Sequence, residues 1–466
     1  MSECIFETEL KEECGVFGIF NAKNNQAAEN IYLGLRALQH RGQEACGIYC
    51  VGDNEFSLQK DDGLVHDVFY DAKLKEMNGN SGIGHVRYST FGGSSYNNIQ
   101  PFVFFYGDKN FGLCHNGNIV NSKELKASLE QKGSIFQATS DSEVLAHLIN
   151  RQGFENPMEA IKESLNYVVG AFIFLILIDK KIYCARDKNG IRPLSIGMKD
   201  DDTYVVASET CALEAVGAEF VRDLLPGEVI EISENGIKSE FYATGTNMSL
   251  CAMEYIYFSR PDSDLEGINV HLSRKEAGKL LAKKSEVKAD IVIGVPDSSI
   301  SSAIGYSQAS GIPYEVGLVK NKYMGRTFIE PTQFLRERAV ALKLAAVKQA
   351  VSGKDIVLID DSIVRGTTLK RIVKILKEAN AKKIHIRISS PPITHPCFYG
   401  VDTGTFEELI MNKSTKEDLC EHLGADTLEF LNIEDIKKST GHQELCFSCF
   451  SGSYVTPTFN LLQKEN

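Results

Sequence analysis

The segment 356–368, IVLIDDSIVRGTT, constrains the fold of this chain more than any other stretch. Four apolar residues open it, and such a run is typical of a strand buried on both faces of a parallel sheet. Asp360 and Asp361 follow at the carboxyl end of that strand, where open α/β sheets bind their ligands. A loop of small residues then leads into a helix with one apolar face. The segment therefore predicts a strand–loop–helix unit of an α/β domain.

The loop of this unit has the chemistry of a sugar-phosphate site. A helix that starts after Gly366, Thr367 and Thr368 offers backbone N–H groups, two hydroxyls and a positive dipole end to a phosphate. Carboxylates repel a phosphate, so Asp360 and Asp361 favour sugar hydroxyls or a Mg²⁺ ion between them and the ligand. The loop lacks the G-K-[ST] ending of a P-loop and has no G-x-G-x-x-G opening, so a ribose phosphate fits better than a nucleoside triphosphate or a dinucleotide. The alternative is an ordinary strand–turn–helix with two solvated acids.

Length and composition limit the remaining possibilities. A chain of 466 residues is long enough for two or three domains. Its net charge of −12 argues against nucleic-acid or anionic-membrane partners, which require a basic surface. The longest apolar run, 168–178, is too short to span a bilayer and predicts a core strand. Residues 1–13 are acidic without an apolar segment, so they are no signal peptide and a cytoplasmic protein is expected.

The pattern of predicted elements changes near residues 242–249, a polar stretch that contains glycine. Before it, strands are short and linked by hairpins, as at 204–208 and 228–232. After it, strands alternate with longer helices, as in parallel α/β domains. The two halves are therefore expected to be domains of different class, at 14–245 and 250–466.

Cys14 opens the first apolar strand and, taken alone, is most simply a core cysteine. A thiol becomes a nucleophile only beside a base or with a lowered pKa. Removal of residues 1–13 would supply a base, because a free α-amine has a pKa of about 7.7–8.0 whereas an amide nitrogen is not basic. Four motifs follow Cys14 in order: LQHRGQ at 38–43, GHVRYST at 84–90, CHNGN at 114–118 and SDSE at 140–143.

Each motif also has a purely structural explanation. Asn116-Gly117 suits a type I′ hairpin turn, and Ser140-x-x-Glu143 suits a capping box before a helix at 144–150. Arg87 would fit a surface ion pair. The ordered set of motifs nevertheless resembles the class II glutamine amidotransferases, whose nucleophile is an N-terminal cysteine.

This resemblance implies the N-terminal-nucleophile fold, an αββα sandwich of two antiparallel sheets between helices. Cys14 would attack the glutamine side-chain amide, while the Asn116 side chain and the Gly117 N–H would form the oxyanion hole. Glutamate and ammonia would be the products. Arg87 would pair with the substrate α-carboxylate through its planar fork, and Asp141 would hold the α-ammonium. The residues implied to bind glutamine are Arg41, Arg87 and Asp141.

Residues 357–368 resemble the phosphoribosyl pyrophosphate (PRPP) loop of type I phosphoribosyltransferases, which implies an α/β domain in the second half. The segment 290–299 repeats the order of strand, acid and hydroxyls and resembles the pyrophosphate loop, although a turn with an N-cap would look the same. The basic segment 320–331 resembles the flexible loop that closes over PRPP, with a solvated loop as the alternative. The implied PRPP-binding residues are Asp297, Ser298, Ser299, Lys320, Arg326, Asp360, Asp361, Ser362, Arg365, Gly366, Thr367 and Thr368. The implied Mg²⁺ site consists of Ser298, Asp360 and Asp361.

Over almost the whole chain, the motifs resemble the family of glutamine PRPP amidotransferases. These enzymes make 5-phosphoribosylamine, glutamate and pyrophosphate from PRPP, glutamine and water, at the first committed step of purine synthesis. The resemblance further implies a homotetramer, feedback by purine nucleotides, and a sealed ammonia passage near Tyr257 and Phe258. Two other hypotheses are a class II amidotransferase with a different acceptor and a non-catalytic nucleotide-binding regulator.

Twelve irregularly spaced cysteines in such a chain do not indicate a disulfide framework. Cys446-x-x-Cys449 alone suits a zinc, redox or structural role, and four thiolates hold Zn²⁺ or an iron–sulfur cluster equally well. Some members of the family carry both a cleaved leader and a [4Fe–4S] cluster. Resemblance to that branch implies a propeptide at 1–13 and four cluster ligands: Cys251, Cys397, Cys446 and Cys449.

Overall fold

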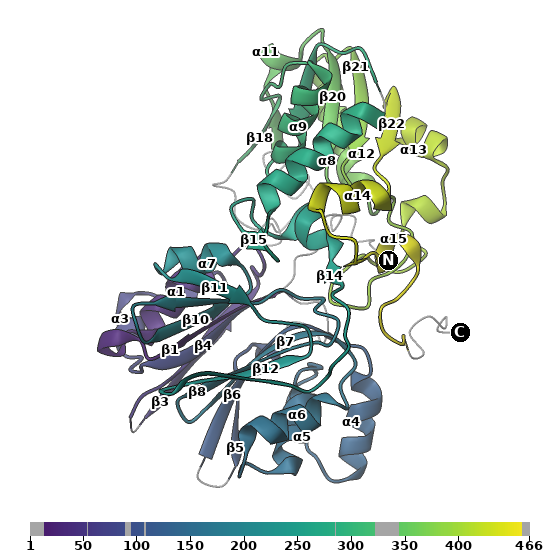
Figure 1. Ribbon diagram of the computed structural model, residues 1–466. Helices are drawn as coiled ribbons and strands as arrows, with labels where there is room; N and C mark the ends of the chain where they lie inside the picture. Colours follow the sequence, from purple (N-terminus) through teal and green to yellow (C-terminus); the bar gives the residue numbers. More distant parts are fainter. Residues whose placement is uncertain are drawn as a thin grey trace.

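The structure, a computed structural model, describes residues 14–53, 55–88, 95–106, 109–284, 286–321 and 344–458. The first half of the chain forms the lower part of Figure 1, and the second half forms the α/β part above it. The two parts meet around β14 (Leu250–Cys251) and the π-helix η3 (Glu254–Phe258).

Two antiparallel sheets make up the centre of the first half. The seven strands of one sheet are, in spatial order, β11 (Glu219–Asp223), β9 (Ser195–Lys199), β10 (Thr203–Ala207), β1 (Gly15–Phe20), β4 (Ser81–Arg87), β2 (Ala45–Val51) and β3 (Phe56–Asp62). The six strands of the other are β13 (Gly236–Phe241), β12 (Glu228–Ser233), β8 (Lys181–Arg186), β7 (Gly170–Ile178), β6 (Lys109–Ile119) and β5 (Phe102–Tyr106).

Strand β7 shows why these sheets are stacked between helices. All nine of its residues are buried. Ile173 and Leu175 join the core between the two sheets, whereas Phe172 and Phe174 join the core beneath the helices. Because successive side chains of a strand point to opposite faces, a strand that is apolar throughout has to be covered on both sides. The prediction of a core strand at 168–178 is confirmed.

Helices cover the outer face of each sheet (Figure 1). The helices on the seven-stranded sheet are α1 (Ala27–Ala37), α2 (Val65–Val68), α3 (Asp71–Lys75) and α7 (Thr210–Ala215). Those on the six-stranded sheet are α4 (Ser122–Gln131), α5 (Glu143–Gln152) and α6 (Pro157–Leu165). The layer order confirms the predicted αββα sandwich.

A four-stranded parallel sheet forms the centre of the second half. Its strands are, in spatial order, β17 (Ile291–Gly294), β20 (Asp355–Asp360), β21 (Lys383–Ile388) and β22 (Thr427–Phe430). One face packs on α8 (Val270–Lys284), α9 (Ile300–Ser310) and α14 (Ile433–Thr440), and the other on α12 (Thr367–Glu378) and α13 (Lys416–Leu423). In β20, Val357 and Ile359 face the first helix group while Ile356 and Leu358 face the second. The predicted strand–loop–helix unit and the α/β class are confirmed.

Short elements connect these layers. They are η1 (Lys23–Asn25), η2 (Tyr96–Asn98), β15 (Asp264–Leu265), β16 (Ile268–Asn269), β18 (Leu318–Lys320), β19 (Leu344–Ala346), α11 (Lys348–Val351), η5 (Ile410–Asn412), β23 (Leu445–Cys446) and α15 (Ser448–Ser451). Among the residues that the structure describes, no helix combines the length and the apolar character needed to cross a membrane.

Candidate active sites

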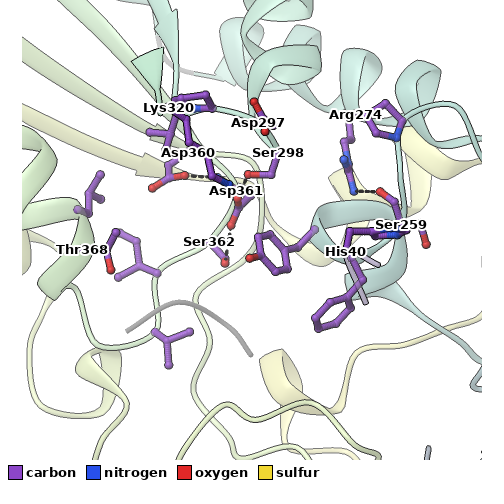
Figure 2. A pocket seen from close by; sticks show the side chains of 18 of the residues that line it. His40, Ser259, Arg274, Asp297, Ser298, Lys320, Asp360, Asp361, Ser362 and Thr368 are labelled. Atoms are coloured by element: carbon purple, nitrogen blue, oxygen red, sulfur yellow. Dashed lines mark hydrogen bonds between the residues drawn. The ribbon is translucent and has the colours of Figure 1, made fainter. Parts of the chain in front are cut away.

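A cavity of about 310 Å³ lies at the carboxyl ends of β17 and β20. Parallel strands present their carboxyl ends at the same edge of a sheet, so Asp297 and Ser298, which follow β17, meet Asp360 and Asp361 at the end of β20. Figure 2 shows these side chains around one space. The predicted PRPP-binding residues that line it are Asp297, Ser298, Lys320, Asp360, Asp361, Ser362, Gly366 and Thr368.

Serine hydroxyls orient the two buried acids. Ser362 Oγ donates to Asp361 Oδ1 at 2.8 Å, and Ser298 Oγ donates to the other oxygen of the same carboxylate. Ser299 Oγ donates to Asp360 Oδ1 at 3.3 Å. Carboxylate and hydroxyl oxygens are hard ligands of the kind that Mg²⁺ prefers. The donor set therefore fits the ion that the sequence predicts.

The start of α12 forms another part of the cavity wall. Gly366 precedes the helix with a φ of +75°, a left-handed conformation that glycine adopts without steric cost. Its carbonyl accepts the hydrogen bond of Lys370 N at 3.0 Å. The N–H groups in the first turn of any helix have no acceptor within that helix, so this end suits a phosphate. Thr368 lines the cavity, whereas Thr367 is exposed and lies outside the lining.

Basic side chains surround the acids. Arg274 of α8 is buried and donates to Tyr255 O at 2.7 Å and to Ser259 O at 2.8 Å. Burial lowers the pKa of Arg274 to about 10 while the charge of Asp361 opposes the shift, so the guanidinium stays protonated at neutral pH. The basic residues of the lining are His40, Arg260, Arg274 and Lys320.

Three of these basic residues were not singled out from the sequence, and three of the predicted PRPP-binding residues are not part of the cavity lining. His40 stands inside the LQHRGQ motif, which was the available signal, while Arg260 and Arg274 carry no local signal. Ser299, Thr367 and Arg365 were predicted to bind PRPP but lie outside the lining, and Arg365 Nη2 instead lies 2.9 Å from Glu408 Oε2. Arg326 falls outside the described residues.

The predicted glutamine-site residues gather where the two sheets of the first half meet. Cys14 precedes β1, and its Sγ lies 3.6 Å from Tyr88 O, just after β4. Gly15 is opposite Val86 in the antiparallel pair of β1 and β4, so the start of one strand adjoins the end of the other. Arg87, the last residue of β4, is buried beside this junction.

Asn116 points toward this junction from the second sheet. Cys114 and Asn116 are two residues apart on β6 and so share a face, and Cys114 lies in the core between the sheets. Asn116 is 1% exposed, yet neither Oδ1 nor Nδ2 has a hydrogen-bond partner within the described part of the chain. A buried amide in this state is costly unless a ligand satisfies it. The hairpin-turn explanation for Asn116-Gly117 is excluded, because both residues lie within β6.

The backbone N–H groups two residues before and two residues after Gly117 each donate to a side chain. His115 N donates to Gln100 Oε1 at 2.6 Å, and Ile119 N donates to Asp141 Oδ2 at 2.7 Å. Alternate residues of a strand direct their N–H groups to the same edge. The Gly117 N–H therefore faces the same edge as these two bonds, next to the side chain of Asp141.

Gly117 and Asp141, which lie at this edge, are both fixed: Gly117 by close packing and Asp141 by a hydrogen bond. Gly117 has a φ of +137°, and a Cβ there would lie 2.0 Å from Ala171 O, so no other residue fits. Asp141 is held by the Ile119 bond described above and is buried. Helix α5 begins at Glu143, whose Oε2 accepts from Ala138 N at 2.7 Å, and this bond takes the place of a capping box with Ser140.

Arg41 connects the two sites. A Cβ on Gly15 would lie 3.4 Å from Arg41 Cδ, so the aliphatic part of the Arg41 side chain packs beside Gly15, the residue that follows Cys14. Its buried guanidinium forms ion pairs with Glu209 and Glu254 and donates to Ser259 Oγ at 3.1 Å, and Ser259 lines the cavity. Although burial opposes ionisation of Glu254, the adjacent guanidinium groups hold its pKa below the usual value. Arg41 therefore lies between the two sites, and its guanidinium is engaged by protein groups.

The four predicted cluster cysteines converge where the halves meet. Cys251 of β14 lies opposite Cys446 of β23 in a parallel pair, and Cys449 follows in α15. Cys397 Sγ accepts from Tyr399 N at 3.3 Å, and all four cysteines pack in one core. Burial raises the pKa of Cys397 to about 11, and the neighbouring Cys446 adds to the shift.

Four sulfur atoms are the donor chemistry of an iron–sulfur or zinc site, so these residues fit the predicted group. In the described ranges, no three His, Cys, Asp or Glu side chains already have positions that would hold a metal ion. None of the cysteines in those ranges forms a disulfide.

Comparison with known proteins covers both halves. The family model described as a glutamine amidotransferase domain matches residues 85–215, and the phosphoribosyl transferase domain model matches residues 269–390. A curated amidophosphoribosyltransferase of Bacillus subtilis is 52% identical over 457 residues, covering 97% of this chain and 95% of that protein. One from Staphylococcus aureus is 48% identical over 452 residues, covering 96% and 91%.

A solved structure gives the same result. Glutamine PRPP amidotransferase from B. subtilis, in complex with ADP and GMP, matches with a TM-score of 0.91 and 51% identity, over 96% of this chain and 98% of that one. Another matching structure, of an allosteric regulatory enzyme of purine biosynthesis, also gives a TM-score of 0.91 at 51% identity. This chain therefore belongs to the amidophosphoribosyltransferase family, which joins a glutamine amidotransferase to a phosphoribosyltransferase.

Proposed function

We propose that the chain releases ammonia from glutamine at Cys14 and adds it to PRPP at the cavity beside Asp360 and Asp361. The observation that carries this proposal is that the cavity wall combines residues of both halves, with His40 from the first half opposite the paired acids. The products are 5-phosphoribosylamine, glutamate and pyrophosphate. The reaction begins de novo purine synthesis.

In the first half, the Cys14 sulfur attacks the side-chain carbonyl carbon of glutamine. After removal of residues 1–13, the α-amine of Cys14 accepts the thiol proton and delivers it to the leaving nitrogen. The Asn116 amide and the Gly117 N–H stabilise the oxyanion of the tetrahedral intermediate. Ammonia leaves, and water then hydrolyses the thioester to give glutamate and restore the thiol.

Two charged groups hold the amino-acid end of glutamine. Arg87 binds the α-carboxylate and Asp141 binds the α-ammonium, because a planar guanidinium and a carboxylate are the matching partners. Arg41, which was predicted to bind glutamine, receives a supporting role. Its guanidinium faces Glu209, Glu254 and Ser259, so it fixes the segment beside Cys14 against the cavity wall.

In the second half, ammonia attacks the anomeric carbon of PRPP with inversion, and the bond to pyrophosphate breaks. Asp360 and Asp361 hold the ribose diol, while the start of α12 receives the 5′-phosphate. Arg274 and Lys320 bring positive charge to the leaving pyrophosphate. Mg²⁺, for which PRPP amidotransferases have a requirement, would neutralise phosphate charge when held by the oxygen atoms of Ser298, Asp360 and Asp361.

Ammonia has to pass between the sites without meeting bulk water, where it would become protonated and lose its nucleophilicity. Tyr257 and Phe258 of η3 line the cavity. Phe258 is buried, and its ring stands 5.4 Å from that of Tyr257, measured between ring centroids. We propose that these two rings form the cavity end of the ammonia route.

Replacement Asn116→Ala tests the glutaminase assignment. We expect kcat for glutamine-dependent synthesis to fall roughly 10²- to 10³-fold with little change in the KM for glutamine, because the amide contacts only the developing oxyanion. Synthesis from added ammonia should stay at the wild-type rate. Steady-state pyrophosphate release with either nitrogen source measures both values. A parallel fall in both activities, or a large rise in KM alone, would contradict the role given to Asn116.

We further propose that Cys251, Cys397, Cys446 and Cys449 hold a [4Fe–4S] cluster with a structural role. Protein prepared without oxygen should contain roughly four iron atoms and four sulfides per chain. The Cys446→Ser variant should lose the iron and the sulfide and should lack the visible absorption of the cluster. The Cys420→Ser variant, whose cysteine lies outside this core, should keep the iron, the sulfide and the absorption. Zinc in place of iron in the wild-type protein would overturn the assignment.

Four further proposals rest on the family and on composition. The solved relative bound to ADP and GMP supports feedback by purine nucleotides. A homotetramer and the domain limits 14–245 and 250–466 stay predictions, and the two matched domain models fall inside those limits. A cytoplasmic location also stays a prediction, supported by the curated relatives that are amidophosphoribosyltransferases.

A further inference from the structure

The strand that carries the oxyanion hole has sheet support on one edge only. Strand β5 pairs with β6 no further than Leu113, whereas β7 pairs with it as far as Ile119. From residue 114 onward, the other edge of β6 faces the glutamine site. Gly117 lies in this one-sided segment, where the N–H groups of His115 and Ile119 bond to side chains, and a contact on the face of the strand would add a further restraint.

A segment of the second half supplies that contact. Asn118 Nδ2 donates to Phe398 O at 2.9 Å, across 280 positions of sequence. Asn118 and Asn116 are two residues apart on β6, so both side chains leave the strand on the same face. The bond therefore restrains the face from which the Asn116 amide projects.

Gly400 packs against the carbonyl group of Gly117, the residue whose N–H is part of the proposed oxyanion hole. A Cβ at residue 400 would lie 3.4 Å from Gly117 C and 3.5 Å from Gly117 O, and 3.1 Å from Arg192 Nη2. Its φ of +108° is a conformation that residues with a side chain rarely adopt. Gly400 thus covers the carbonyl side of Gly117, and a side chain at residue 400 would be disfavoured by the backbone conformation and would have to displace the end of Arg192.

The 397–400 segment is itself firmly held. Arg192 donates to Tyr399 O, and Cys397 N donates to Thr403 Oγ1 at 2.8 Å. The Tyr399 hydroxyl accepts from Thr456 N at 2.8 Å. Tyr399 and Arg192 are buried, so these bonds are shielded from water. A fixed segment can act as a support, whereas a loosely held one could not.

We propose that Asn118 and Gly400 are positioning residues that set the oxyanion hole of the first half from the 397–400 segment of the second half. This inference rests on the proposed function, in which Asn116 and Gly117 bind the oxyanion. Loss of the Asn118 bond, or a side chain at residue 400, would shift Gly117 and its N–H away from the tetrahedral intermediate. Misplacement of a catalytic group by an ångström costs up to about 10²-fold in rate. The cavity for PRPP does not contain Asn118 or Gly400, so ammonia-dependent synthesis is unaffected.

Asn118→Ala and Gly400→Ala test this role. Each should lower kcat for glutamine hydrolysis by about 10-fold or more, with the KM for glutamine within about 3-fold of wild type. A second readout is inhibition by glutamate γ-semialdehyde, whose adduct with the thiol places an oxyanion in the hole. Inhibition by the semialdehyde should weaken in parallel with kcat, while inhibition by glutamate should not change.

Asn121→Ala is the matched control. Asn121 Nδ2 donates to Tyr167 O at 2.9 Å, and its Oδ1 accepts from Val169 N, so this variant loses comparable bonds close by without touching the 397–400 segment. Its melting temperature should fall while its semialdehyde affinity stays at the wild-type value. Normal semialdehyde affinity in both Asn118→Ala and Gly400→Ala would overturn the inference. If Asn116→Ala also kept normal affinity and rate, the proposed function of that residue would fail instead.

Discussion

Cys14→Ala is expected to abolish synthesis from glutamine and to leave synthesis from added ammonia near the wild-type rate. The thiol forms the covalent bond to the substrate, and enzymes that lose their nucleophile slow by about 10⁴- to 10⁶-fold. Ammonia needs no thiol, because it reaches the PRPP cavity already as the nucleophile. Pyrophosphate release with each nitrogen source, at saturating PRPP, measures the two rates on one preparation.

The mature N-terminus decides how this result is interpreted. Mass spectrometry of the wild-type protein should find Cys14 as the first residue, because an uncut chain has no amine there to act as base. A folded Cys14→Ala protein that loses both activities would contradict the division of roles between the halves. Full glutamine-dependent activity in a chain that retains residues 1–13 would contradict the assignment of the base.

The double replacement Asp360→Ala with Asp361→Ala is expected to remove synthesis from both glutamine and ammonia, by more than about 10³-fold. Two buried carboxylates and the ion that they are proposed to hold provide several kcal/mol, and each 1.4 kcal/mol corresponds to about a factor of ten. Titration calorimetry with PRPP and Mg²⁺ should detect no binding of PRPP to the double variant.

Asp355→Ala is the control for this double variant. Asp355 lies at the opposite end of the same strand, away from the cavity lining. The Asp355→Ala variant should bind PRPP as tightly as the wild-type chain. If the double variant still bound PRPP, the substrate would have to bind outside this cavity, and the proposed second step would lose its basis. Release of pyrophosphate only when PRPP is present would exclude an amidotransferase with another acceptor.

Much of the fold follows from local patterns in the sequence. The apolar residues 170–178 and 356–359 lie in strands covered on both faces, because an uninterrupted apolar run leaves neither face suited to water. The paired acids meet the loop after β17 because parallel strands end at a common edge. In these cases each pattern is contained in one strand and the loop after it, and the common edge of parallel strands brings the two loops together.

The parts that could not be predicted depend on contacts between distant segments. His40 and Arg274 reach the PRPP cavity from a loop of the first half and from α8, and nothing in their neighbouring residues indicates this. Asn116-Gly117 has the sequence of a hairpin turn but lies inside β6, because tertiary pairing with β7 overrides the local preference. Asn118 was part of a recognised motif, yet its contact with Phe398 appears only in the folded chain.

The ion pair of Arg41 with Glu254 restricts how such an enzyme can evolve. Both side chains are wholly enclosed, and a carboxylate or guanidinium stranded in that state by loss of its partner destabilises a protein by about 3–5 kcal/mol. Recombination that exchanged one half for an unrelated module would create this stranded charge at the new junction. The two halves are therefore expected to be inherited together, with changes on one side of the junction matched by changes on the other.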